Sequence, residues 1–82
     1  MTILILGEVS HPGAFLVEQN APLAHVLALG GGLTDYASRD SIFVVRQLPA
    51  PERVRFTYEA ILRNEGRAGA FPMHPGDLVE VE

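Results

Sequence analysis

The sequence contains no cysteine, and this absence excludes several classes of site at once. Disulfides, thiolate nucleophiles, iron–sulfur clusters and cysteine-ligated zinc all require cysteine sulfur. The absence leaves the cellular compartment open, because many exported domains fold without disulfides.

Lysine is also missing. All six basic residues are arginines, and the net charge is −4. They stand apart from one another at Arg39, Arg46, Arg53, Arg55, Arg63 and Arg67. Binding to a phosphate backbone needs a dense positive face, so we expect no nucleic-acid partner.

Long apolar runs are absent as well. No apolar run is longer than residues 3–6, which is far shorter than the roughly 20 residues that a helix needs to cross a bilayer. Met1 leads directly into this apolar stretch, without the basic segment that begins a signal peptide. We expect no direct membrane insertion by this domain, and we expect any export signal to lie outside this chain.

The remaining composition is that of one small folded domain. The chain has 82 residues, of which 48% are hydrophobic and 20% charged, which is typical of a globular protein. Residues 2–9 are apolar in both alternating sets, which predicts a central strand at least partly covered on both faces. Pro12 and Gly13 occupy the second and third positions of a predicted type II turn, and this turn leads into a second strand.

A single long helix follows. Asn20 is the predicted cap and Pro22 lies in the first turn. Leu23, Val26 and Leu27 share one face at helical spacing. The three glycines at residues 30–32 follow the last turn, where glycine adopts the left-handed conformation at little cost.

The pattern as a whole predicts an α+β fold of the β-grasp type. The predicted elements are strands at 2–9 and 14–17, the helix, strands at 41–46 and 53–58, a helical turn at 59–64 closed by Gly66, and a strand at 78–82. We expect a loop at 48–52 and a second Pro-Gly turn at 74–77. The sheet is mixed, with about four or five strands, the main helix on one face and the short helical turn before the last strand. The crossover helix requires the first and last strands to run parallel in the sheet centre.

Several short motifs, taken in order, resemble one known family. They are Gly7-Glu8-Val9, Pro12-Gly13, Gly31-Gly32-Leu33-Thr34, Val44-Val45-Arg46 and Pro75-Gly76-Asp77-Leu78-Val79. Together they resemble the soluble ligand-binding β-grasp (SLBB) family, in particular the copies in outer-membrane polysaccharide export proteins. The predicted structural turns and caps are Gly7, Pro12, Gly13, Gly31, Gly32, Pro75, Gly76 and Asp77. Gly30 stands where this resemblance implies alanine, which should loosen the helix end by about 1 kcal/mol.

The resemblance implies a non-catalytic module that binds carbohydrate, takes part in subunit assembly, or does both. Its setting would be the periplasmic part of an outer-membrane-associated exporter of capsule or exopolysaccharide. The implied partners are the polysaccharide and sister domains or subunits. We expect residues 1–82 to be one domain excised from a larger exported protein. The alternative is a purely structural oligomerisation domain of a ring-shaped exporter, with no ligand of its own.

Metal, cofactor and catalytic sites are not predicted. His25 lies opposite the apolar face of the helix, and His11 and His74 should lie at opposite ends of the sheet. Ser10, Ser38, Ser41 and the three scattered histidines do not predict a nucleophile–base–orienter arrangement. The glycines at residues 30–32 follow a helix, whereas phosphate loops precede one.

One group of polar residues is a candidate ligand site. The predicted topology brings the first turn and the loop after the helix to the same end of the sheet. The candidate ligand-binding residues are therefore His11, Pro12, Asp35, Tyr36, Arg39 and Asp40. Sugar recognition needs placed donors and acceptors together with a flat apolar face, and these side chains offer both. Two alternatives remain: Arg39 and Asp40 only stabilise the loop, or the group contacts a neighbouring subunit. Arg46 is expected to have a structural role.

Overall fold

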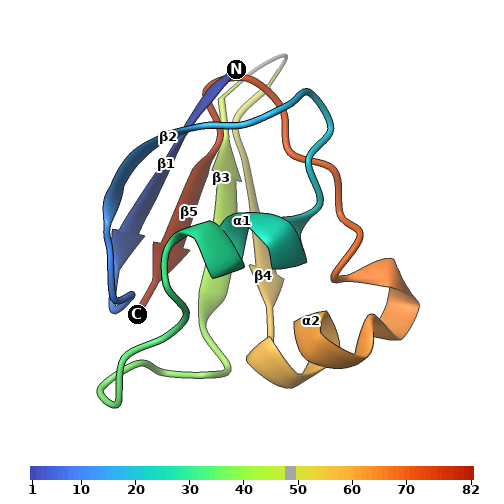
Figure 1. The fold of residues 1–82 in the computed structure, drawn as a ribbon. Helices are drawn as coiled ribbons and strands as arrows, with labels where there is room; N and C mark the ends of the chain where they lie inside the picture. The colour runs from blue at the N-terminus through green and yellow to red at the C-terminus, as the bar shows by residue number, and fades with distance from the viewer. Residues whose placement is uncertain (48–49) are drawn as a thin grey trace.

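The computed structural model describes residues 1–47 and 50–82, in which a five-stranded sheet packs against two helices (Figure 1). The elements in chain order are β1 (Thr2–Gly7), β2 (Gly13–Leu16), α1 (Leu23–Leu29), β3 (Ile42–Arg46), β4 (Glu52–Phe56), α2 (Tyr58–Arg63), a 3₁₀ turn (Glu65–Arg67) and β5 (Leu78–Val81). Part of the loop predicted at 48–52 lies outside the described residues, and Glu52 belongs to β4.

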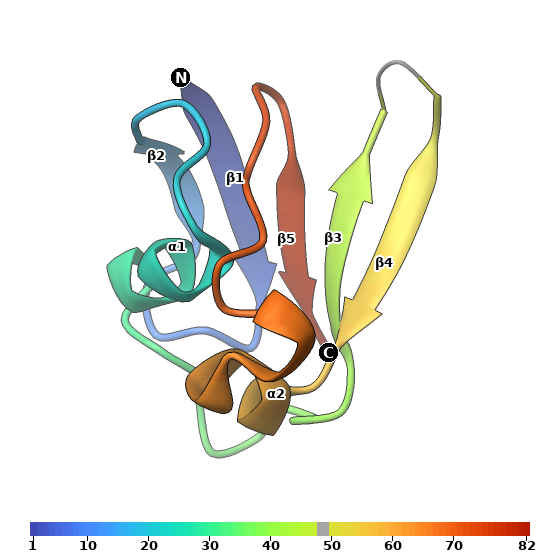
Figure 2. The same cartoon turned by 90° about the vertical axis from the view of Figure 1, so that its right-hand side faces the viewer.

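The predicted β-grasp topology is confirmed. The strand order is β2-β1-β5-β3-β4, and β1 and β5 lie side by side in parallel (Figure 2). Leu4 is paired with Leu78 and Gly7 with Val81, while the other neighbouring strands are antiparallel. The two ends of the chain therefore supply adjacent strands near the middle of the sheet.

In residues 1–47 and 50–82, the helices cover one face of the sheet. Ile3 and Ile5 of β1 are fully buried under the helices, whereas Leu4 and Leu6 on the other face are 42% and 43% exposed. The prediction that both faces of this strand are covered is therefore wrong in part. An alternating sequence cannot show that both helices pack on the same side, which leaves the second apolar row open to solvent.

The strand β1 ends earlier than predicted, at Gly7. This residue has a φ of +95°, and the carbonyl oxygen of Val81 occupies the place that a Cβ would take. The next residue, Glu8, donates its N–H to that same oxygen at 2.9 Å. Gly7 thus turns the chain out of the sheet, while Glu8 remains hydrogen-bonded to β5. Val9 forms an isolated β-bridge with Leu33.

The two Pro-Gly turns differ. Gly13 has a φ of +148°, far from the +80° or so of a type II turn, and β2 already begins there. The predicted first turn is therefore wrong: a wider loop is held by the His11 N–H, which donates to the Gly30 carbonyl at 2.8 Å. The second turn is confirmed, because Gly76 has a φ of +81° and the Asp77 N–H donates to the His74 carbonyl at 3.1 Å.

The start of α1 also differs from the prediction. Asn20 has a φ of +61° and caps nothing, since the helix begins after Pro22 without a side-chain cap. The free N–H groups of Leu23 and Ala24 instead donate to the carbonyls of Phe71 and Gly69, at 2.9 and 3.0 Å. A segment distant in the sequence thus replaces the local cap. The predicted apolar face and the glycine end of the helix are confirmed.

The helix α2 has a local cap that the sequence analysis overlooked. The Thr57 hydroxyl accepts a hydrogen bond from the Ala60 N–H at 3.1 Å. The helix ends at Asn64, which is left-handed with a φ of +53°, and not at the predicted Gly66, which lies in the 3₁₀ turn.

Removal of this cap should have a measurable effect on stability. We expect Thr57→Ala to lower the free energy of unfolding by about 1 kcal/mol, because the Ala60 N–H loses its partner. The conservative variant Thr57→Ser keeps the hydroxyl and should lose less than half as much. Urea unfolding followed by circular dichroism measures both, and equal losses in the two variants would show that the hydroxyl is not responsible.

The strand β4 lies at the edge of the sheet. The guanidinium of Arg53 lies 3.5 Å from the centre of the Phe43 ring and forms ion pairs with Glu80 and Glu82. Arg55 is exposed and donates to the backbone carbonyl of Asp40 at 2.7 Å. Charged side chains along an edge discourage pairing with a further strand.

Candidate functional site

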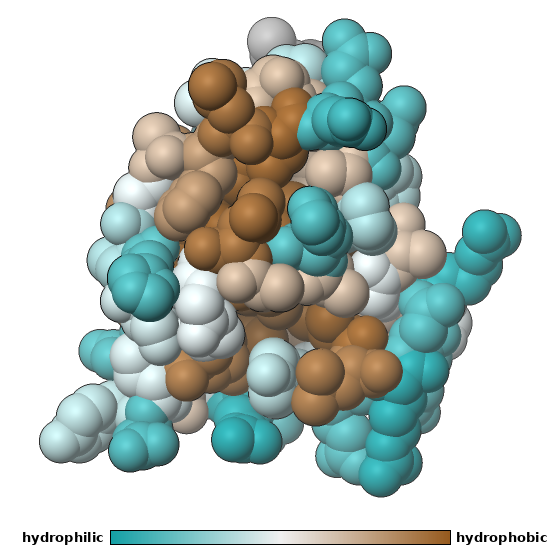
Figure 3. Space-filling model, viewed as in Figure 1, coloured by the Kyte–Doolittle hydropathy of each residue, from teal (hydrophilic) through white to brown (hydrophobic). Residues whose placement is uncertain are grey.

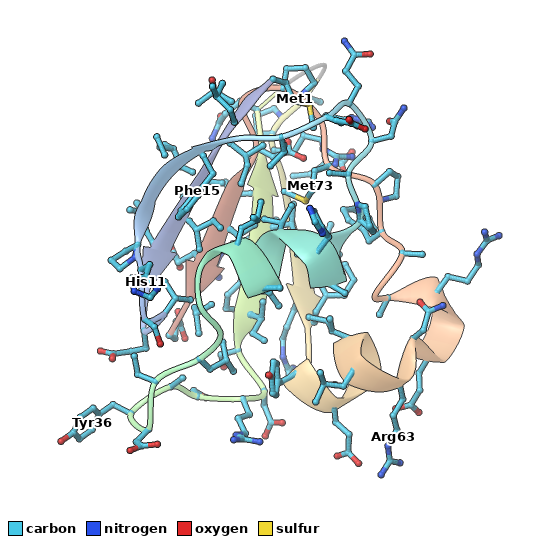
Figure 4. The ribbon with its side chains drawn as sticks, viewed as in Figure 1. Met1, His11, Phe15, Tyr36, Arg63 and Met73 are labelled. Carbon is cyan, nitrogen blue, oxygen red and sulfur yellow. The ribbon has the colours of Figure 1, made fainter. Side chains whose placement is uncertain are left out.

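The predicted ligand-site residues lie at one end of the molecule but in three separate places. Figure 4 shows His11 and Tyr36 at the same end of the molecule. His11 lies in the loop between β1 and β2, and Tyr36 lies at the tip of the loop that follows α1. The first turn and the loop after α1 thus lie at the same end of the sheet, as the predicted topology requires. The side chains do not converge on one point.

His11 lies against the end of α1. Its imidazole lies next to Gly31, so a Cβ on Gly31 would overlap the Nδ1 atom of His11. Gly31 also has a φ of +80°. Two backbone bonds join the same segments, because Ser10 and His11 donate to the carbonyls of Gly32 and Gly30 at 3.0 and 2.8 Å. His11 therefore belongs to the contact between the hairpin loop and the helix end, and Pro12 beside it is exposed.

Tyr36 extends away from the body of the molecule (Figure 4) and is 87% exposed. Its backbone N–H donates to the Thr34 hydroxyl at 3.3 Å, and that hydroxyl donates to the Glu8 carboxylate at 2.8 Å. The base of the loop is thus fixed, while Asp35 and the Tyr36 ring face solvent.

Arg39 and Asp40 line a hollow with residues that the sequence analysis did not select. The hollow has a volume of about 250 Å³, and its other lining residues are Tyr58, Glu59 and Leu62 at the start of α2. The guanidinium carbon of Arg39 lies 5.3 Å from the centre of the Tyr58 ring, within the range of a cation–π contact. We call this hollow the Arg39–Tyr58 cleft.

The backbone holds the two walls of the Arg39–Tyr58 cleft together. The Tyr58 N–H donates to the Arg39 carbonyl at 2.7 Å, and the Arg55 side chain donates to the Asp40 carbonyl. The Thr57 cap fixes the first turn of α2, from which Tyr58 and Glu59 project. The loop and the helix are therefore positioned before any ligand arrives.

The charges of the cleft are mixed. Arg39 is positive, while Asp40 and Glu59 are negative, and Glu59 forms an exposed i,i+4 ion pair with Arg63 at 2.8 Å. An exposed pair of this kind contributes little to stability. The side chains remain able to exchange this pairing for hydrogen bonds to a neutral polar ligand.

The tightest polar arrangement of the described residues is structural. Asp77 is 1% exposed, and its carboxylate accepts from the Arg46 guanidinium at 2.7 Å and from the His74 N–H at 2.8 Å. Arg46 also donates to the Pro72 carbonyl and lies 5.2 Å from the centre of the Phe71 ring. Arg46 thus holds the segment that precedes β5, which confirms the predicted structural role.

The hydrogen bond to Asp77 raises the pKa of the Arg46 guanidinium, with a smaller opposing effect from burial. A basic group whose pKa is higher in the folded chain stabilises the fold fully at pH values below its ordinary pKa. This stabilisation is lost only when the pH rises above that ordinary pKa. Arg46 is therefore a permanent positive charge at neutral pH.

Within residues 1–47 and 50–82, no three metal-ligating side chains of the types His, Asp and Glu gather into a cluster. The register of β1 and β5 places His11 beyond one end of the sheet and His74 beyond the other, and His25 is exposed on α1. In the same ranges, no helix is both long and apolar enough to cross a membrane.

Comparison with protein families gives a match to the SLBB domain over residues 2–56. Comparison with curated proteins gives no significant match. The matched region runs from β1 to the end of β4 and contains the hairpin, the crossover helix and the Arg39–Asp40 loop. β5 follows outside it and completes the same sheet. By this match and by its β-grasp topology, the chain belongs to the SLBB family of soluble ligand-binding β-grasp domains.

Proposed function

We propose that this SLBB domain is a non-catalytic carbohydrate-binding and assembly module of a bacterial polysaccharide-export protein. Its place would be the periplasm, within an outer-membrane-associated protein. The family is one of binding domains, and this supports recognition without chemistry. The polymer would contact the domain at the Arg39–Tyr58 cleft.

The observation that carries the proposal is the pairing of an aromatic ring with fixed polar groups in the cleft. Sugars present hydroxyl groups around a ring with apolar C–H faces. The Tyr58 ring and Leu62 offer apolar surface, and Arg39, Asp40 and Glu59 offer donors and acceptors in the same hollow. The hollow has a volume of about 250 Å³, so we expect it to contact one or two sugar units of a chain.

The cleft is also suited to weak, reversible binding of a polymer that is being exported. Its charged groups are exposed to solvent, and no deeply buried polar anchor lines it. Binding energy concentrates in well-packed, desolvated contacts, so an open site of this kind binds weakly. Weak contact at each domain, repeated along an exporter, would guide a polysaccharide without retaining it.

Glycan binding can be tested by titrating oligosaccharide fragments into the labelled domain and following backbone amide shifts. We expect the amides of Arg39, Tyr58 and Glu59 to shift at millimolar ligand, and the Arg39→Ala variant to bind at least about fivefold more weakly. The matched control is Arg53→Ala, which removes an arginine stacked on a ring away from this cleft. Unchanged amide spectra with acidic and neutral fragments at tens of millimolar, including those of His11 and Tyr36, would refute glycan binding.

A further inference from the structure

A second, smaller hollow adjoins the Arg39–Tyr58 cleft. It has a volume of about 120 Å³, lies between α1 and α2, and shares Tyr58 and Leu62 with the cleft. Its other lining residues are Ala24, Leu27, Ala28, Gly32 and Ile61. We call it the interhelical hollow. Because the two spaces share a wall, a ligand in the cleft can extend a substituent into the hollow.

Small side chains on α1 leave this space open. Ala24 and Ala28 are one helical turn apart and line the hollow on the side of α1 toward α2. Leu27 and Ile61, each 3% exposed, bound the hollow where it meets the hydrophobic core. Figure 3 shows apolar surface between α1 and α2, with hydrophilic side chains beside it. The hollow is therefore formed by packed residues before any ligand arrives.

The lining of the interhelical hollow determines what can enter it. Among the described residues that line it, none is charged, and the Tyr58 hydroxyl is the only side-chain hydrogen-bonding group. The several hydroxyl groups of a second sugar unit would lose water there without enough new partners, whereas a methyl group gains by leaving water. At about 30 Å³ for each water-sized group, the hollow accepts about four such groups, so a long acyl chain would not fit.

We propose that the cleft and the hollow together select sugar units that carry an acetyl group. The sugar ring lies in the Arg39–Tyr58 cleft, and the acetyl methyl lies in the interhelical hollow against Ala28. The acetyl group suits both spaces, because its carbonyl oxygen can accept a hydrogen bond from a donor such as the Tyr58 hydroxyl, while its methyl is apolar. This inference rests on the proposed function, since it names the class of sugar that the same site binds.

Two trisaccharides with the same linkage test this selection. Triacetylchitotriose carries an acetamido group on each ring at the position where cellotriose carries a hydroxyl group. We expect the labelled domain to bind triacetylchitotriose at least about threefold more tightly than cellotriose, the gain from burying about one methyl group. Backbone amide shifts measure both affinities, and the amides of Ala28 and Gly32 should shift only with the acetylated trimer.

The variant Ala28→Leu fills the hollow with a side chain of the protein. Ala28 is exposed on α1 and leucine is a good helix former, so we expect the variant to fold. Its preference for the acetylated trimer should disappear, so that the two trimers bind with equal affinity. The matched control is His25→Leu, which places the same side chain on α1 outside this hollow and should keep the preference of the unmodified chain.

The outcomes separate this inference from glycan binding itself. Equal binding of the two trimers by the unmodified domain would overturn acetyl selection while glycan binding stands. A preference that Ala28→Leu leaves intact would overturn the assignment to the interhelical hollow. If neither trimer binds, acetyl selection is also overturned, and the titration with acidic fragments then decides whether the cleft binds glycan at all.

Discussion

Gly7→Ala should unfold most of the protein at room temperature. The added Cβ would overlap the carbonyl oxygen of Val81, which belongs to the backbone of β5 and has no rotamer to change. The φ of +95° at Gly7 adds a cost of about 1 to 2 kcal/mol for any side chain. We expect a loss of more than about 4 kcal/mol, comparable to the whole stability of a domain of this size.

Gly76→Ala is the matched control for this variant. Gly76 also has a positive φ, +81°, but a Cβ there would meet no atom within 4 Å. Gly76→Ala should therefore lower the free energy of unfolding only by the cost of a positive φ for alanine, about 1 to 2 kcal/mol. Urea denaturation of both variants, followed by circular dichroism, separates the steric effect from the conformational one. Similar losses in the two variants would show that β1 and β5 can separate at Gly7 without damage.

The second large effect is expected at Asp77. Asp77→Ala leaves the His74 N–H and the Arg46 guanidinium without their shared acceptor in a largely buried site. Removal of one partner from a buried ion pair typically lowers stability by about 3 to 5 kcal/mol. Because Arg46 keeps the Pro72 carbonyl as a second acceptor, we expect about 3 kcal/mol here.

The exposed pair of Arg53 and Glu80 provides a control of the same chemistry. Its members are 3.1 Å apart but largely exposed, so Glu80→Ala should lower stability by less than about 1 kcal/mol. A double-mutant cycle with Arg46→Met and Asp77→Ala measures the coupling directly, and we expect it to exceed 1 kcal/mol. Coupling near zero would mean that Asp77 acts through the His74 turn alone.

The order of elements along the chain and the parallel central pair were accessible from sequence because local signals carry them. Prolines, glycines and apolar alternation mark the elements, and the handedness rule for crossovers leaves few topologies. The start of α1 was not accessible in this way. Asn20 and Pro22 have the composition of a cap, but the N–H groups of Leu23 and Ala24 donate to the carbonyls of Phe71 and Gly69, which lie far along the sequence.

The candidate site was also predictable from the sequence only in part. The topology places Arg39 and Asp40 at the correct end of the sheet, but their neighbours in the cleft come from a part of the sequence predicted to be a strand and a helical turn. Tyr58 was assigned to the strand predicted at 53–58, whereas β4 ends at Phe56 and Thr57 caps α2. The sequence signal that was overlooked is this threonine, whose hydroxyl marks the start of α2 by accepting from the Ala60 N–H three residues later.

The pairing of β1 with β5 has a consequence for how the chain acquires its structure. Leu4 and Leu78 are neighbours in the sheet although almost the whole sequence separates them. The entropy of closing so large a loop must be overcome before the central pair can form, and folds dominated by such distant contacts reach the native state slowly. During synthesis, the hairpin and α1 would leave the ribosome first and wait with their apolar faces uncovered until the last strand emerged. The central pair of strands can therefore form only after β5 has left the ribosome.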